Sequence, residues 1–380
     1  MAFKIAGEGD LDRVFFTEHE LIDRFVGSKL FTAGFNNYGQ LCDGTSVRKS
    51  YPVQIGSLTN WKQLSGGAFH TLALNMDGTA WACGNNSGGQ LGDGTTTSKS
   101  SPVQVGDLSD WNTVSSAGYL SAGTKVDGTL WTWGSNFDGE LGDGTTVRKS
   151  SPVQVGSLTD WAHISCGYNY ATAIKSDGTL WAWGGNSYGK LGDNTVVSKS
   201  SPVQIGSLTN WKQVSGGDFH TVAVKTDGTL WAWGGDAYGQ LGDSTTVDKS
   251  SPVQIGSLTD WKQVSCGYSN TAAVKNDGTL WTWGWNYYGQ LGDGTNVTKS
   301  SPVQVGTLKD WKYVACGYGH VAAVKTDGTL WTWGYNYYGQ LCDGGSGSGG
   351  TKSSPVQVGT TNWKSPACGS YHTLLLSYGI

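Results

Sequence analysis

The sequence predicts an all-β fold, a seven-bladed β-propeller of four-stranded blades with a short N-terminal helical extension. Three observations predict it. Tryptophan opens one recurring unit every 50 residues, for example at Trp61 and Trp111. Each unit carries an Asp-Gly turn between two alternating apolar runs, which is a hairpin signal. Residues 29–60 and 363–380 are the two halves of one further unit, so pairing them would close a ring.

The composition is typical of a chain with many tight turns and an aromatic core. The 380 residues include 59 glycines and 19 tryptophans beside 2 methionines. A net charge of −4 argues against the basic face of nucleic-acid binders. No apolar stretch approaches the about 20 residues that cross a bilayer, and the first residues lack a secretory signal. We therefore expect a virion or cytoplasmic protein, with no nucleic-acid partner and no membrane insertion.

Residues 1–28 form an extension before the first repeat strand, and a short helix is predicted over about residues 17–26. Thr17 and Glu20 have the spacing of a capping box at its start. The helix would present one apolar face, made by Leu21, Ile22, Phe25 and Val26. This face covers the propeller rim or anchors the protein in an assembly by docking into a protein partner.

Residues 29–380 are predicted to form the propeller. The six whole units span 61–110, 111–160, 161–210, 211–260, 261–310 and 311–362. The seventh is split, since 29–60 reproduces the second half of the unit and 363–380 the first half. The split unit is divided at the position where each of the six whole units carries its Asp-Gly-Thr turn. Both ends of the propeller should therefore meet at one hairpin tip.

Each unit has signals for four strands. In the unit that starts at Trp261, the chain should turn back at Asp277-Gly278, because Asp-Gly accepts the positive φ values of a type I′ turn. The segments WKQVSCG before this hairpin and SPVQVG after it supply two further strands. Trp231 and Trp233 are two residues apart, so their indoles should share one sheet face and pack between blades.

The run CGYGHVAAVKTDGTLWTWGYNYYGQLCDG, at 316–344, resembles the regulator-of-chromosome-condensation repeat. The resemblance covers the chain from about residue 29 onward, and it implies a seven-bladed propeller. It leaves function open, because members of that family act as exchange factors, chromatin readers or general interaction platforms. The extension before the repeats loosely resembles the leaders of phage-encoded virion and appendage proteins.

Neither a catalytic centre nor a cofactor site is predicted. The repeated serines and aspartates occur in every unit, whereas catalytic residues are rarely repeated seven times. One register holds His70, His220, His320 and His372. Symmetry spreads these side chains around the ring, so a packing or hydrogen-bonding role is favoured over metal binding. A second position of the repeat is Gly or Ser in some units and cysteine in four: Cys166, Cys266, Cys316 and Cys368. We expect these thiols to be buried and inert.

Cys42 and Cys342 replace a glycine of the repeat. They lie in the split unit and in the unit adjoining it, next to the ring closure. A disulfide between them would lock that closure, provided that the two Cα atoms come within about 4.4–6.8 Å. The alternative is that both remain free thiols.

Five aromatic residues break the repeat on three neighbouring blades: Trp285, Tyr287, Tyr335, Tyr337 and Phe35. They belong to the loop between the third and fourth strands, which should lie on the face opposite the chain ends. Clustered rings give a large contact area at low entropic cost, which suggests a binding surface for a protein or glycan. Sequence drift on a tolerant loop is the alternative.

These features favour a non-catalytic interaction propeller in a larger assembly such as a phage or virus particle. The extension would anchor it, and the aromatic loops would contact a host receptor, a glycan or a neighbouring subunit. One alternative is a guanine-nucleotide exchange factor or chromatin-binding propeller, although the chain lacks a basic tail and a long loop in an early unit. A second alternative is a sugar-binding lectin.

Overall fold

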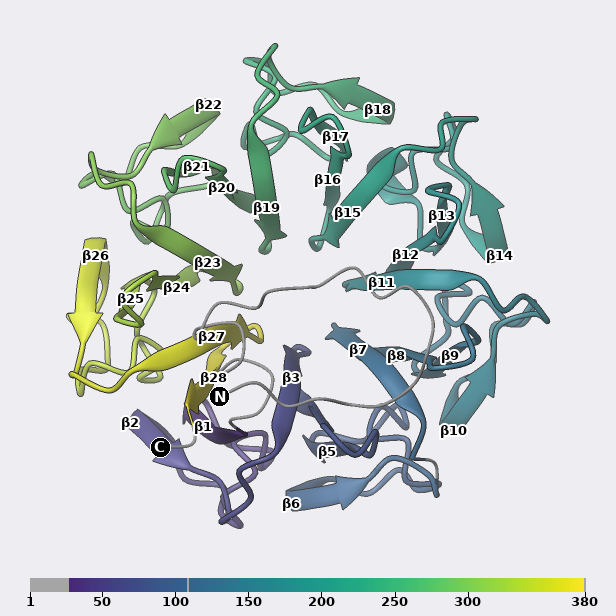
Figure 1. Ribbon diagram of the computed structural model, residues 1–380, viewed down its shortest axis with the longest axis horizontal. Helices are drawn as coiled ribbons and strands as arrows, with labels where there is room; N and C mark the ends of the chain where they lie inside the picture. Colours follow the sequence, from purple (N-terminus) through teal and green to yellow (C-terminus); the bar gives the residue numbers. More distant parts are fainter. Residues whose placement is uncertain (1–26, 108, 379–380) are drawn as a thin grey trace, which may run out of the picture.

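Seven four-stranded antiparallel sheets form a closed ring in the computed structural model, which describes residues 27–107 and 109–378 (Figure 1). We number these sheets as blades 1 to 7 in ring order. The predicted propeller is confirmed, including the split blade. The predicted helix over 17–26, with Leu21, Ile22, Phe25 and Val26, lies outside the described residues.

The strands follow the repeat closely. Blade 1 contains β1 (Ser28–Gly34), β2 (Lys49–Gln54), β27 (Trp363–Cys368) and β28 (His372–Tyr378). Blade 2 contains β3 (Trp61–Gly66), β4 (His70–Asn75), β5 (Ala80–Gly84) and β6 (Lys99–Gln104). Blade 3 contains β7 (Trp111–Ala117), β8 (Leu120–Lys125), β9 (Leu130–Gly134) and β10 (Lys149–Gln154). Blade 4 contains β11 (Trp161–Gly167), β12 (Tyr170–Lys175), β13 (Leu180–Gly184) and β14 (Lys199–Gln204).

The remaining three blades repeat this order. Blade 5 contains β15 (Trp211–Gly216), β16 (His220–Lys225), β17 (Leu230–Gly234) and β18 (Lys249–Gln254). Blade 6 contains β19 (Trp261–Cys266), β20 (Asn270–Lys275), β21 (Leu280–Gly284) and β22 (Lys299–Gln304). Blade 7 contains β23 (Trp311–Cys316), β24 (His320–Lys325), β25 (Leu330–Gly334) and β26 (Lys352–Val358). A one-turn 3-10 helix, η1 (Ser187–Gly189), lies between β13 and β14.

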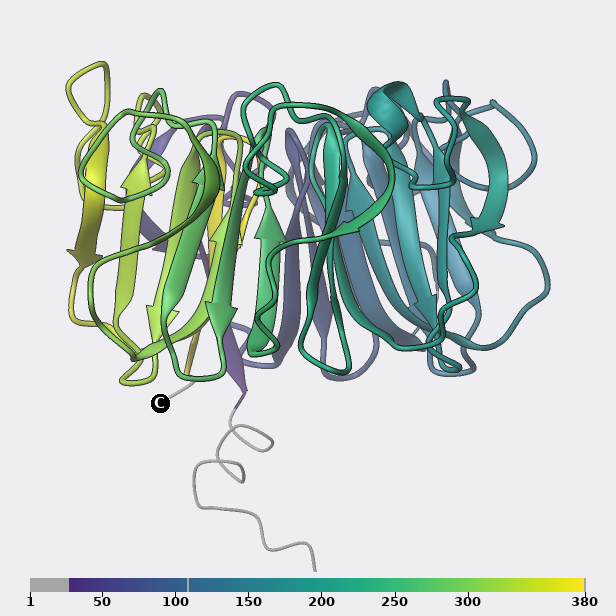
Figure 2. The ribbon, with the colours of Figure 1, turned by 90° about the horizontal axis from the view of Figure 1, so that it is seen from above.

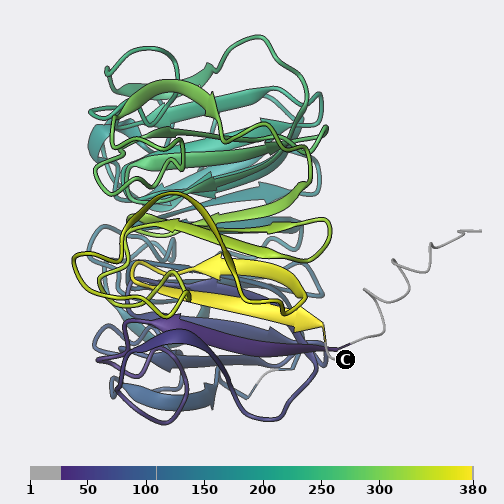
Figure 3. The ribbon, with the colours of Figure 1, turned by 90° about the vertical axis from the view of Figure 1, so that its left-hand side faces the viewer.

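The ring is closed by pairing the two ends of the propeller. In blade 1, β1 pairs with β28 in continuous register from Ser28–Tyr378 to Gly34–His372. Figure 3 shows β1 and β28 side by side, reaching the same edge of the ring. Ser28 and Tyr378 occupy the place where the other blades have their Asp-Gly turn, as predicted. This pairing removes the open strand edges that an incomplete ring would expose.

The Asp-Gly hairpins form where predicted but with a different turn. In blade 6 the N–H of Gly278 donates to the carbonyl of Lys275 at 3.0 Å, so Asn276 and Asp277 are the central residues. Gly278 has φ +80°, whereas Asp277 does not have positive φ. The turn is therefore followed by one left-handed glycine, instead of the two positive φ values of a type I′ turn. Asp277 Oδ1 fixes it by accepting the N–H and hydroxyl of Thr279.

Tryptophan fills the space between neighbouring blades. Trp233 is fully buried in a cluster that contains residues of blades 4 and 5, and Trp231 packs against the same cluster. Trp233 Nε1 donates to the carbonyl of Lys190 in the preceding blade at 3.0 Å. Both indoles therefore face the preceding blade, as the spacing predicted. Burying a ring of this kind contributes about 2–3 kcal/mol.

In blades 3 to 7, a glycine in a loop of the preceding blade faces the fully buried indole of the third strand. A Cβ atom on Gly292 would lie 2.7 Å from Nε1 of Trp333, so no side chain fits there. Two interfaces depart from this pattern. The indole is replaced by Cys83 at the interface of blades 1 and 2, and by Ala33 at the interface of blades 7 and 1. At these two interfaces the facing glycine is replaced by Cys42 and Cys342, respectively, which occupy the vacant space.

Neither alternative considered for Cys42 and Cys342 holds, because the two are not bonded to each other and only one of them is a free thiol. Cys42 is joined to Cys83, with the two Cα atoms 5.5 Å apart, while Cys342 is a buried free thiol in the same cluster as Ala33. The reason is geometric. The interface brings a loop of one blade against the third strand of the next blade, so equivalent positions of neighbouring blades do not meet. The disulfide therefore fastens blade 1 to blade 2.

Candidate protein-binding face

Two loops from each blade build the face opposite the meeting point of the propeller ends. They are the short loop between the first and second strands and the long loop between the third and fourth strands. Figure 2 shows the long loops and η1 at the upper side of the ring, and the start of β1 at the lower side. The topological expectation that these loops lie opposite Ser28 and Tyr378 is confirmed.

A buried asparagine holds the long loop in shape in six of the seven blades. In blade 6, Asn286 Nδ2 donates to Asp293 Oδ1 and to the carbonyls of Thr295 and Val297, at 3.1 to 3.3 Å. Its Oδ1 accepts the N–H of Leu291 at 2.9 Å. One fully buried side chain thus fixes several points of the loop. Aspartate takes this position in blade 5 as Asp236, and burial raises its pKa to about 7.

Aromatic rings from these loops form one connected network of ring contacts, which we call the aromatic face. Its members are Phe35, Tyr38, Phe69, Tyr119, Tyr188, Phe219, Tyr238, Tyr268, Trp285, Tyr287, Tyr288, Tyr318, Tyr335, Tyr337, Tyr338 and Tyr371. Every blade contributes at least one ring. Contacting rings at these distances stabilise one another and keep the surface ordered.

The structure places the five predicted aromatic residues within this network. Trp285 and Tyr335 both contact the ring of Tyr288, with centroids 5.3 and 4.5 Å away. Tyr287 and Tyr337 stack outside them and are 68% and 47% exposed, which makes them available to a partner.

Phe35 differs from the other four predicted residues because it is buried, with 8% of its surface exposed. Its ring lies 4.8 Å from that of Tyr338, and the guanidinium carbon of Arg48 lies 5.3 Å from its centroid. Phe35 therefore belongs to the network but lies beneath its exposed rings.

Most of the network escaped the sequence analysis because its members belong to the repeat. Tyr238, Tyr288 and Tyr338 recur in one register, as Tyr38 and Tyr188 do, and a repeated residue was interpreted as scaffold. The signal that could have found them is their position in the same loops as Trp285. A residue of the repeat can also be functional when its loop is exposed.

The aromatic network is interrupted between blades 3 and 4, where charged residues replace the repeat. Glu140 and Lys190 stand where the other five blades have glutamine, and Asp218 occupies a position of the short loop in blade 5. Lys190 Nζ donates to Asn169 Oδ1 and, at 3.1 Å, to the carbonyl of Asp218. Asn169 Nδ2 in turn donates to Asp138. The sequence analysis missed this cluster, although three charged exchanges in neighbouring units would have indicated it.

Burial shifts the protonation equilibria of this cluster. Burial lowers the pKa of Lys190 to about 8, although the negative charge of Asp218 opposes the shift. Burial raises the pKa of Asp218 to about 7, against the opposing effect of Lys190. Burial also raises the pKa of Glu140. Carboxylates and an ammonium group thus share a poorly solvated region of this face.

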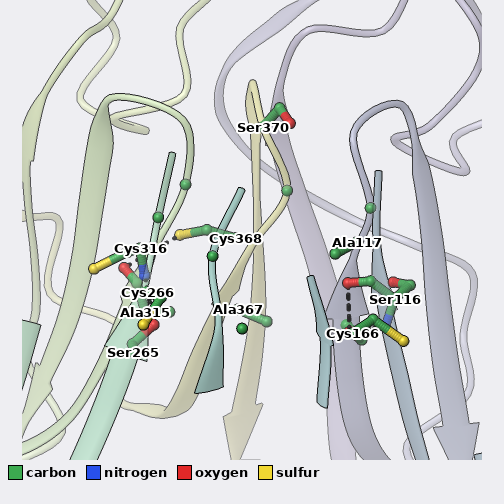
Figure 4. A pocket seen from close by; sticks show the side chains of 18 of the residues that line it. Ser116, Ala117, Cys166, Ser265, Cys266, Ala315, Cys316, Ala367, Cys368 and Ser370 are labelled. Carbon is green, nitrogen blue, oxygen red and sulfur yellow. Dashed lines mark hydrogen bonds between the residues drawn. The ribbon is translucent and has the colours of Figure 1, made fainter. Parts of the chain in front are cut away.

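A central channel of about 220 Å³ runs along the axis between the first strands (Figure 4). The thiols of Cys166, Cys266, Cys316 and Cys368 lie along it. Cys166 Sγ donates to the carbonyl of Ser115 in the preceding blade at 3.4 Å, and burial raises the pKa of this thiol to about 12. The thiols are therefore protonated at neutral pH and poorly suited to nucleophilic chemistry.

The four histidines bridge neighbouring blades. His220 Nε2 lies 2.9 Å from Thr271 Oγ1 of the next blade, and His70 makes the equivalent contact with Ser121. Burial lowers the pKa of His220 to about 3, so it is neutral in the folded protein.

Within 27–107 and 109–378, no three His, Cys, Asp or Glu side chains are grouped to hold a metal ion. In the same residues, no helix is long and apolar enough to span a membrane.

Comparison with protein families identifies the repeat. The model described as "Regulator of chromosome condensation (RCC1) repeat" matches seven times, at residues 28–74, 77–123, 127–174, 177–224, 227–274, 277–324 and 327–376. The chain belongs to the RCC1 repeat family. A second model of this family matches five stretches, 61–90, 161–190, 211–240, 261–290 and 311–340. The resemblance inferred from the sequence is confirmed, and a comparison with curated proteins finds no match.

Solved structures share the fold over nearly the whole chain. Human WBSCR16 has a TM-score of 0.84 at 21% identity, covering 93% of this chain and 99% of its own. Yeast RCC1 (Prp20), solved bound to Kap60, has a TM-score of 0.84 at 17% identity, covering 100% and 96%. A structure of Prp20p from Saccharomyces cerevisiae, whose description includes binding to Gsp1p and histones, also scores 0.84 at 17% identity, covering 98% and 97%. At these identities the likeness concerns the fold alone.

Proposed function

We propose that this RCC1-type propeller is a non-catalytic protein-binding module that contacts its partner through the aromatic face. The observation that supports it most directly is the connected network of rings with Tyr287 and Tyr337 exposed at its surface. Tyrosine and tryptophan are enriched at protein interfaces because they bring large contact area at low conformational cost. Blade-to-blade hydrogen bonds and buried indoles hold this surface rigid, which lowers the entropic cost of binding.

The proposal is tested with two matched double variants in quantitative affinity purification. Tyr287→Ser with Tyr337→Ser removes exposed rings from the aromatic face. Leu158→Ser with Leu208→Ser removes exposed leucines beside the Asp-Gly turns on the opposite face. A protein retained by the parent chain and the leucine variant but depleted about tenfold by the tyrosine variant is expected. Equal retention by both variants would contradict a role of the aromatic face.

An exchange factor for a small GTPase is the second candidate. It is favoured by the near-complete superposition on Prp20p, a protein described with its binding to Gsp1p. Faster release of bound nucleotide from a small GTPase in the presence of this protein would select this candidate. Glycan-array binding that disappears in Trp285→Ala would select a lectin instead.

A role in a phage or virus particle has no support among these relatives. It would depend on Leu21, Ile22, Phe25 and Val26, which lie outside the described residues. We therefore base the proposed function on the aromatic face alone.

A further inference from the structure

A cavity of about 520 Å³ opens where the aromatic network is interrupted, between blades 3 and 4. Three rings contribute to its walls: Tyr119, Phe137 and Tyr168. Phe137 is 83% exposed and stands at the edge of the cavity. The polar lining includes the side chains of Asp138, Glu140 and Asn169. Aromatic and acidic groups thus meet in one recess, which Arg148 also lines.

Glu140 carries a charge that its structural role does not require. Its Oε2 accepts the N–H of Asp138 at 2.8 Å, and in blade 5 the neutral amide of Gln240 accepts the N–H of Tyr238 in the same way at 2.9 Å. Glu140 is 2% exposed, so its carboxylate pays a desolvation penalty that glutamine avoids. Among the residues that the structure describes, no basic side chain forms an ion pair with it.

Two cations lie near these carboxylates. Lys190 does not line the cavity; it donates to Asn169 and to the carbonyl of Asp218, and the negative charges of Asp218, Asp138 and Glu140 act on its ammonium group. Arg148 lines the cavity, where its guanidinium donates to the carbonyl of Ser87 at 3.1 Å. Among the lining side chains, the carboxyl groups of Asp138 and Glu140 outnumber the guanidinium of Arg148. The lining therefore has a net negative charge when its carboxylates are ionised.

We propose that this cavity receives the guanidinium group of an arginine side chain on the partner protein. This inference rests on the proposed protein-binding function of the aromatic face. A planar guanidinium forms bidentate hydrogen bonds with carboxylates and stacks on aromatic rings, and this cavity offers both. An uncharged sugar would be served equally well by glutamine at position 140. The added charge therefore favours a cationic ligand.

The inference is tested with a small probe that needs no partner protein. Arginine blocked as its N-acetyl N′-methylamide is titrated against the full chain by saturation-transfer NMR, and blocked citrulline serves as the neutral isostere. The arginine probe should bind at least tenfold more tightly than the citrulline probe. Glu140→Gln should remove this preference and weaken arginine binding about tenfold or more, because it removes a charge-assisted hydrogen bond. Glutamine occurs at this position in five blades, so the variant should fold.

The leucine variant, Leu158→Ser with Leu208→Ser, should bind the probe as the parent chain does. Equal binding of arginine and citrulline probes, absence of probe binding, or unchanged arginine binding by Glu140→Gln would overturn the inference. Preferential binding of a neutral saccharide at this cavity would also overturn it. If the probe binds as expected but the tyrosine variant still retains every partner, the arginine site stands and the proposed role of the aromatic face fails.

Discussion

At the scale of single residues, the two losses of a buried indole are each paired with the loss of the facing glycine across a blade interface. Where the buried indole becomes Cys83, the facing glycine becomes Cys42, and where it becomes Ala33, the facing glycine becomes Cys342. Close packing explains both pairs, since a lost indole leaves a cavity that a cysteine on the opposite side partly fills. Cys42 and Cys342 keep the left-handed backbone of the glycine, with φ of 61° and 62°.

This pairing predicts that Ala33→Cys forms a second disulfide, with Cys342. Ala33 and Cys342 have the same relation across their interface as Cys83 and Cys42, which are bonded. Peptide mapping under non-reducing conditions should recover the new cross-link. It should stabilise the oxidised variant by roughly 2–4 kcal/mol relative to its reduced form, beyond the effect of reducing the parent chain.

The control for this prediction is Ala33→Cys combined with Cys342→Gly, which cannot form the bond. Recovery of two free thiols at positions 33 and 342 after air oxidation would show that the two interfaces are not equivalent.

The buried histidines predict a loss of stability on acidification. His220 has its pKa lowered to about 3, whereas an unfolded histidine titrates near 6.5. Between these pH values the unfolded chain binds a proton that the folded chain does not, so stability falls as the pH decreases below 6.5. His220→Asn should reduce this loss by up to about 1.4 kcal/mol per pH unit. Urea unfolding at pH 7, 6, 5 and 4 measures it, and an unchanged pH dependence would contradict a neutral buried His220.

At the scale of elements, the long loop between the third and fourth strands determines which surface the protein presents. Its shape depends on a buried side chain, Asn286 in blade 6, and not on regular secondary structure. The same loop carries Trp285 and Tyr287. The support and the exposed rings are therefore neighbours in sequence.

Asn286→Ala should loosen this loop and leave the strands of blade 6 intact. The substitution removes hydrogen bonds to Leu291, Asp293, Thr295 and Val297, at a cost of about 2–4 kcal/mol. Hydrogen exchange should accelerate in peptides covering residues 285–297, with β20 as the internal control. Asn286→Asp keeps the acceptor for Leu291, as Asp236 does in blade 5, and should give a smaller effect. Equal exchange in the parent chain and Asn286→Ala would refute the supporting role.

Strands and hairpins could be predicted from the sequence because their signals are local. Alternating apolar residues and Asp-Gly turns repeat in every unit, and the prediction of four strands for each blade is confirmed. The prediction of a type I′ turn was wrong, because Asp277 and Gly278 are compatible with more than one hairpin turn. The pairing of Cys42 with Cys83 was also missed, since it depends on how a loop meets the next blade, which no local pattern encodes.

At the scale of the whole molecule, ring closure divides the surface into two unlike faces. The propeller ends and the Asp-Gly turns occupy one face, and the aromatic loops occupy the other. Trp285, Tyr287, Tyr335 and Tyr337 were identified by asymmetry between units. Glu140 and Asp218 stand out in the sequence as charged exchanges, but that they lie in one cluster depends on the three-dimensional proximity of blades 3, 4 and 5.

The most direct test of the account is a hydrogen-exchange footprint of the protein in complex with the partner that affinity purification identifies. The account predicts slower exchange on binding in residues 285–288 and 335–338 on the aromatic face, and in residues 137–140 beside the cavity. Protection confined to the Asp-Gly turns, such as residues 276–279, or to the outer strands would contradict it, because the partner would then bind elsewhere on the ring.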